Sequence, residues 1–141
     1  MQVHHLAIAV TDLDSALAFY RDGLGLSVSE IEDVAREGVR VAFLPVGDSH
    51  IELMQPIAAD TGVTKWMAKH GQGMHHLCLA VPDIEAALAR LAAHGAQLIN
   101  PVPVTRTGHD GALTRYAFVH PRSTGGVLLE LYEVAETTDA P

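Results

Sequence analysis

Two histidines and two glutamates recur at matching places in this sequence and could bind a metal ion together. His5 lies in HHLAIAV and His76 in HHLCLAV, while Glu52 lies in HIEL and Glu130 in LLEL. Imidazole nitrogens and carboxylate oxygens are common ligands of divalent Zn, Co, Ni or Mn, and water or substrate oxygens can complete the coordination. We therefore expect one divalent ion, bound by one His and one Glu from each half of the chain.

The alternation of side chains along a strand separates these four residues from their neighbours. Alternate residues of a strand face opposite sides of its sheet. His5 shares a face with Ala7, and His76 with Cys78, so each imidazole would have small neighbours. Each glutamate stands between branched apolar residues and so points away from the core. A single such residue is usually ordinary strand sequence, whereas the symmetric set indicates a metal site.

The chain contains one internal repeat. Residues 4–18 and 75–89 are identical at nine of fifteen aligned positions. A second pair of similar segments, 42–53 and 117–131, follows in the same order with a three-residue insertion. Two matched blocks in one order indicate the duplication of a module of about 70 residues.

Each repeat is predicted to be a βαβββ module, which gives an α+β fold. Thr11 suits the start of the first helix as a side-chain cap, and Pro82 suits the first position of the second helix. We expect these helices to end near Gly23 and Gly95. The strands are expected at 3–10, 26–31, 39–45 and 49–55 in the first module and at 74–81, 97–99, 114–120 and 126–133 in the second.

Domain organisation follows from this pattern. We expect a single domain over residues 1–134, with module one at about 1–60 and module two at about 72–134. Residues at about 61–71, with a helix over 62–70, would link the two modules. The segment 135–141 is expected to be a flexible tail.

Composition excludes several classes of function. The 141 residues carry a formal net charge of −8 with nine Lys and Arg, which disfavours nucleic-acid binding. No apolar run approaches the roughly 20 residues of a membrane span, and the N-terminus lacks the pattern of a signal peptide. A single cysteine, Cys78, excludes an intrachain disulfide framework. These features predict a cytoplasmic protein that binds neither nucleic acid nor membrane.

The sequence resembles the vicinal-oxygen-chelate (glyoxalase–bleomycin resistance) superfamily and, within it, the methylmalonyl-CoA epimerase family. The matching segments are HHLAIAVTDLDSALAFYRDGLGL, GVRVAFLPVGDSHIELMQP, TKWMAKHGQGMHHLCLAVPDIEAAL and HPRSTGGVLLELYE, which together span residues 4–133. The resemblance implies paired βαβββ modules that form a curved mixed sheet around one metal. It places the family's metal ligands at His5, Glu52, His76 and Glu130.

The resemblance also implies a reaction and its participants. It implies interconversion of (2R)- and (2S)-methylmalonyl-CoA by removal and return of the α-proton, with Glu130 and Glu52 as the proton-transfer groups. Some epimerases carry a further carboxylate where this chain has Val41, which leaves the second group open. The resemblance further suggests a homodimer. Candidate cations for the phosphates of coenzyme A are Lys69, Arg106, Arg115 and Arg122.

Three other functions compete with this interpretation. Glyoxalase I (lactoylglutathione lyase) uses a similar set of two His and two Glu on the same fold. A non-catalytic binding module of the drug-sequestering kind generally lacks the metal ligands. An extradiol dioxygenase would use two His and one carboxylate around Fe(II), so Glu52 counts against it.

The loop 104–112 is expected to be flexible and could cover a substrate.

Overall fold

The computed structural model describes residues 1–108 and 111–134. The chain forms two compact units. The N-terminal unit comprises His5–His75, and the C-terminal unit comprises Met1–His4 with His76–Pro141. The segment expected to be a flexible tail lies outside the described residues.

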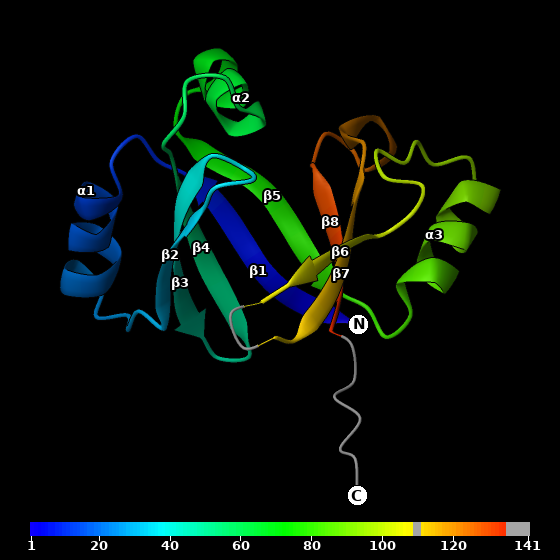
Figure 1. The fold of residues 1–141 in the computed structure, drawn as a ribbon, viewed down its shortest axis with the longest axis horizontal. Helices are drawn as coiled ribbons and strands as arrows, with labels where there is room; N and C mark the ends of the chain where they lie inside the picture. The colour runs from blue at the N-terminus through cyan, green and yellow to red at the C-terminus, as the bar shows by residue number, and fades with distance from the viewer. Residues whose placement is uncertain (109–110, 135–141) are drawn as a thin grey trace, which may run out of the picture. The chain divides into compact units, whose positions relative to one another are not determined.

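The N-terminal unit is built on four strands with a helix against one face (Figure 1). Strands β2, β3 and β4 pair antiparallel in that order, and β4 pairs parallel with β1. The elements are β1 (Gln2–Ala9), α1 (Leu13–Leu17), the π-helical turn η1 (Ala18–Gly23), β2 (Glu30–Val34), β3 (Val39–Val46), β4 (Ser49–Pro56) and α2 (Gly62–His70).

Burial of apolar side chains fixes α1 against its sheet. Leu13 and Leu17 of α1 pack with Leu44 of β3 and Leu53 of β4, and all four are at most 3% exposed. Burying a leucine side chain contributes roughly 1.5–3 kcal/mol. Because side chains alternate along a strand, this packing turns Glu52 and Phe43 to the opposite face.

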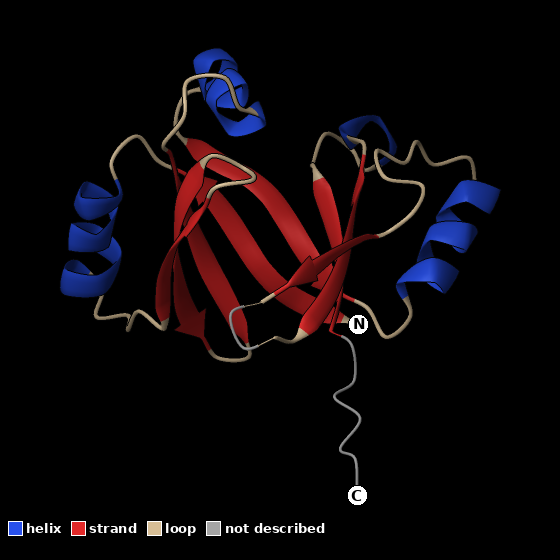
Figure 2. Cartoon of the chain, in the orientation of Figure 1, coloured by secondary structure: helices blue, strands red, loops and turns tan. Residues whose placement is uncertain are grey.

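The C-terminal unit repeats this arrangement (Figure 2). Strand β8 pairs parallel with β5 and antiparallel with β7, and β7 pairs antiparallel with β6. Ile84 and Leu88 of α3 pack with Leu131 of β8 and Ala117 of β7. The elements are β5 (Gly73–Ala80), α3 (Ile84–Ala93), β6 (Val104–Thr107), β7 (Leu113–Val119), the 3-10 turn η2 (Pro121–Ser123) and β8 (Leu129–Val134).

The expected α+β fold of two tandem βαβββ modules with mixed strand pairing is confirmed. Helix α2 occupies Gly62–His70, which is the range expected for the linking helix. In the described residues, 1–108 and 111–134, no helix has the length and apolar character needed to cross a bilayer.

Two edge strands differ from the sequence prediction. Strand β2 occupies Glu30–Val34 rather than 26–31. Leu26 and Val28 pack against the buried cluster around α1 instead of pairing with β3. Strand β6 occupies Val104–Thr107 rather than 97–99, where only Leu98 makes an isolated bridge. The first four residues of the segment expected to be a flexible loop, Val104–Thr107, are therefore paired strand.

The two helix starts also differ. Asp12, not Thr11, caps α1, accepting hydrogen bonds from the N–H groups of Asp14 and Ser15. Helix α3 begins at Ile84 with Asp83 as its cap, so Pro82 stands before the helix instead of inside it. In both units an aspartate carboxylate satisfies N–H groups that the first helical turn leaves unpaired.

Candidate metal centre

In the N-terminal unit, His5 and Glu52 lie side by side on the face turned away from α1. The parallel pairing of β1 with β4 sets Glu52 beside Ala7, two residues beyond His5. His5 Nε2 and Glu52 Oε2 are 3.0 Å apart, and both residues are buried. Phe43, the partner of Glu52 on β3, presents an edge-on ring to the His5 imidazole at 6.4 Å.

In the C-terminal unit, His76 and Glu130 form the equivalent pair. Strand β5 sets Cys78 beside Glu130, and β7 sets Phe118 on its other side. His76 Nε2 and Glu130 Oε2 are also 3.0 Å apart. The Phe118 and His76 rings meet edge-on at 5.6 Å. The structure therefore brings each predicted histidine to the glutamate of its own repeat.

The donor atoms in each pair suit a divalent ion. Ligand atoms about 2.0–2.1 Å from an ion and at right angles to one another lie about 2.9 Å apart. The 3.0 Å separations of imidazole nitrogen and carboxylate oxygen match this spacing. Such buried polar side chains need a hydrogen bond or an ion to offset their lost hydration. The residues present therefore fit the predicted kind of ligand.

Comparison with known proteins identifies the family. Residues 4–118 match the family described as the glyoxalase/bleomycin resistance protein/dioxygenase superfamily. The mitochondrial methylmalonyl-CoA epimerase of Mus musculus is 34% identical over 92% of this chain and 71% of that protein. The chain belongs to this superfamily and to its methylmalonyl-CoA epimerase family.

Solved structures of epimerases share the fold. The methylmalonyl-CoA epimerase of Mycobacterium tuberculosis has a TM-score of 0.83 and 34% identity over 99% of this chain and 92% of its own. A variant of the Streptomyces coelicolor epimerase in complex with 2-nitronate-propionyl-CoA also has a TM-score of 0.83. It is 35% identical over 96% of this chain and 98% of its own. The resemblance stated from sequence is confirmed.

The position where some family members carry a further carboxylate is apolar here. Val41 is 1% exposed and packs with Ala7 and Met54 on the same face as Glu52. Its direct partner on β2 is Glu32, which is partly buried and shares that face. Sequence reasoning missed Glu32 because β2 was placed too early in the chain.

The face that carries Glu130 also carries a tyrosine that sequence reasoning missed. Tyr132 lies two residues beyond Glu130 on β8, and alternation along the strand was the available signal. Burial raises the pKa of the Tyr132 hydroxyl, against the lowering effect of its hydrogen bond to Thr114. The phenol therefore stays protonated throughout the neutral range.

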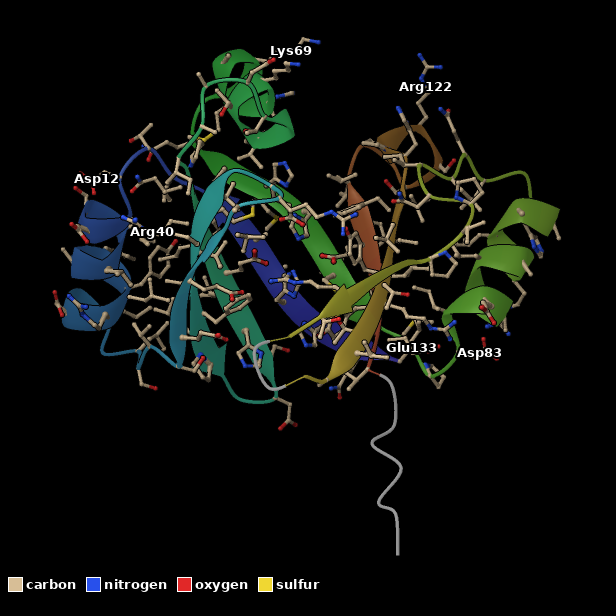
Figure 3. The ribbon with its side chains drawn as sticks, viewed as in Figure 1. Asp12, Arg40, Lys69, Asp83, Arg122 and Glu133 are labelled. Atoms are coloured by element: carbon tan, nitrogen blue, oxygen red, sulfur yellow. The ribbon has the colours of Figure 1, made fainter. Side chains whose placement is uncertain are left out.

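The four cations predicted for coenzyme A differ in their surroundings. Arg115 is committed to ion pairs with Glu133 and Glu85, so it is a poor candidate for a phosphate. Arg106, partner of Thr114 across β6 and β7, lies on the Glu130 face. Lys69 and Arg122 extend outward from α2 and η2 (Figure 3).

Proposed function

We propose that this chain is a metal-dependent methylmalonyl-CoA epimerase in which His5, Glu52, His76 and Glu130 bind one divalent ion together. The observation that carries the proposal is the pair of equivalent His–Glu contacts, each with its donor atoms 3.0 Å apart. The names of the M. musculus and M. tuberculosis relatives support the reaction. The S. coelicolor relative, solved with 2-nitronate-propionyl-CoA, supports an acyl-CoA substrate.

The reaction requires a base and an acid on opposite faces of one carbon. A divalent Zn, Co, Ni or Mn ion would act as a Lewis acid at the substrate oxygens. It would make the α-proton acidic enough for a carboxylate base to remove it. Glu130 removes the proton, and the C–H electron pair passes to the thioester carbonyl. Glu52, from the other repeat, acts as the acid: it gives a proton to the opposite face of the carbon as the electron pair returns from the carbonyl, and it is left as a carboxylate. The two glutamates exchange roles when the reaction runs in reverse.

Aromatic side chains limit water around the reacting groups. Phe43 stands beside Glu52, and Phe118 stands beside Glu130, each with its edge toward the neighbouring imidazole. Apolar walls strengthen the electrostatic interactions of the site and restrict unwanted exchange of protons with solvent. This is the setting that a reactive carbanion-like species requires.

Proton NMR in heavy water tests the reaction. Cobalt-loaded protein is mixed with (2R)- or (2S)-methylmalonyl-CoA, and the α-proton signal is followed together with the conversion between the two isomers. We expect the signal to disappear and both isomers to accumulate. A protein that binds the ion yet leaves the signal intact would refute the proposed reaction.

Replacement of Glu130 by Gln tests the assigned base. The amide keeps the size of the side chain but cannot accept the proton, so we expect deuterium incorporation at the α-carbon to stop. The ion content of E130Q is measured in parallel, because Glu130 is also a proposed ligand. Undiminished incorporation in ion-loaded E130Q would exclude Glu130 as a base.

Glyoxalase I is the competing activity. It is tested by spectrophotometric detection of S-lactoylglutathione from the hemithioacetal of glutathione and methylglyoxal. We expect no product above the uncatalysed rate, and rapid formation would instead favour this alternative.

We further propose that the protein is a cytoplasmic homodimer, on the basis of its single cysteine and the family resemblance. Light scattering of the purified protein tests the dimer.

A further inference from the structure

The strand that carries each proposed ligand glutamate is attached to the start of its own helix. On β4, Gln55 lies three residues beyond Glu52 and accepts a hydrogen bond from the Leu13 N–H, with Oε1 2.8 Å from the nitrogen. On β8, Glu133 lies three residues beyond Glu130 and accepts from the Ile84 N–H, with Oε2 2.7 Å away. Leu13 and Ile84 are the first residues of α1 and α3.

In each unit, the attachment joins the strand that carries the glutamate to the helix that follows the strand carrying the histidine. In the N-terminal unit, β1 carries His5 and leads through a short turn into α1, while β4 carries Glu52 and returns to the same helix through Gln55. The helix start thereby fixes how the histidine strand and the glutamate strand lie along one another. Residues that do not contact the ion but orient its ligands influence the affinity for the ion.

An arginine reinforces the attachment in the C-terminal unit alone. Arg115 on β7 is the cross-strand partner of Glu133, and its Nε lies 3.0 Å from Glu133 Oε1. Its Nη1 also pairs with Glu85 in the first turn of α3, at 2.8 Å. Charged hydrogen bonds of this kind are stronger than neutral ones. Glu133, Arg115 and Glu85 therefore tie β8, β7 and α3 together (Figure 3 labels Glu133).

The equivalent arginine of the N-terminal unit is engaged elsewhere. Arg40 on β3 is the partner of Gln55, whose neutral amide cannot form an ion pair. Arg40 instead pairs with Asp33 on the edge strand β2, with Nε 2.6 Å from Oδ1. The β6 residue opposite Arg115 is Thr105, which offers no charge. The acidic partner of the arginine therefore lies on the edge strand β2 in the N-terminal unit. In the C-terminal unit it lies on β8, the strand that carries Glu130.

We propose that Glu133, supported by Arg115, is a positioning residue that sets the geometry of Glu130 toward the ion. It does so by holding β8 to the start of α3. Gln55 does the same for Glu52 through a neutral contact, so the Glu130 side of the centre is the more rigidly held. This inference rests on the proposed function, because it assumes that Glu130 binds an ion.

Cobalt binding by matched variants tests the inference. Glu133→Gln keeps an acceptor for the Ile84 N–H but loses the ion pair, and Arg115→Met removes the ion pair from the other side. Asp33→Asn removes the equivalent exposed pair in the N-terminal unit and is the control. Affinity for Co²⁺ is measured by calorimetry, and the visible spectrum of the bound ion is recorded, at a temperature where each apoprotein is folded.

We expect E133Q and R115M each to weaken Co²⁺ binding about tenfold and to change the cobalt spectrum. D33N should bind within about twofold of the unchanged protein. The inference is overturned if E133Q and R115M resemble D33N in affinity and spectrum. If the unchanged protein binds no Co²⁺, the proposed metal centre fails instead, before any variant is compared. Glu133→Leu, which also removes the helix contact, should bind more weakly than E133Q.

Discussion

The surroundings of the two glutamates differ although their strands are equivalent. Glu52 lies beside Ala7, and the next residue on its face is Met54, which packs in an apolar cluster. Glu130 lies beside Cys78, and the next residue on its face is Tyr132. Thiol and phenol groups can donate hydrogen bonds, whereas alanine and methionine side chains cannot. This asymmetry gives Glu130 the more polar surroundings of the two.

Titration of the tyrosines tests this description of the Glu130 face. Burial raises the pKa of Tyr132 above its ordinary value of 10.0. A raised folded-state pKa means that the associated stability is fully present below about pH 10 and is lost as the pH rises through the folded value. We expect ultraviolet titration to show a tyrosine that ionises later than a free phenol. Tyr132→Phe should remove this late step, and its persistence in that variant would refute the assignment.

At the scale of elements, the buried strands and the linking helix could be predicted from sequence, and the edge strands could not. The apolar alternation of β1 and β4 reports burial on the α1 face, so it also located His5 and Glu52. Strand β2 reads EIEDV and β6 reads VTRT. Edge strands are held by backbone pairing and can be polar, so hydrophobic periodicity does not locate them. The pairing of Glu32 with Val41 was hidden for this reason.

Helix capping provides an element-scale prediction. The Asp83 carboxylate accepts a hydrogen bond from the Ala86 N–H at 2.9 Å and caps α3. Asp83→Ala should lower the free energy of unfolding by about 1 kcal/mol, whereas Asp83→Asn should retain most of it. Urea denaturation measures both. Asp22→Ala is the control, because Asp22 is exposed and pairs with its chain neighbour Arg21, so its loss should change stability by less than about 0.5 kcal/mol. Equal effects of D83A and D22A would contradict the capping role.

At the scale of the whole molecule, duplication would explain how a short chain supplies the four ligands of the proposed centre. One repeat supplies an imidazole and a carboxylate already 3.0 Å apart, which is too few ligands for tight binding of a divalent ion. A second copy supplies the same pair again. The two copies have since diverged around these residues, at Ala7 and Cys78 and at Gln55 and Glu133.

The number of ions bound per chain tests whether the two pairs act together. If His5, Glu52, His76 and Glu130 share one ion, metal analysis after dialysis should give one ion per chain, and His5→Ala and His76→Ala should each abolish tight binding. Two independent pairs would instead give two weak sites, and each variant would lose only one of them.

A shared ion should also stabilise the fold. At a free ion concentration 100 times the dissociation constant, the stabilisation should be about 2.7 kcal/mol. The apoprotein prepared with a chelator should then melt roughly 10 °C lower than the loaded protein. Equal melting temperatures with and without Co²⁺ would mean that no ion links the two repeats.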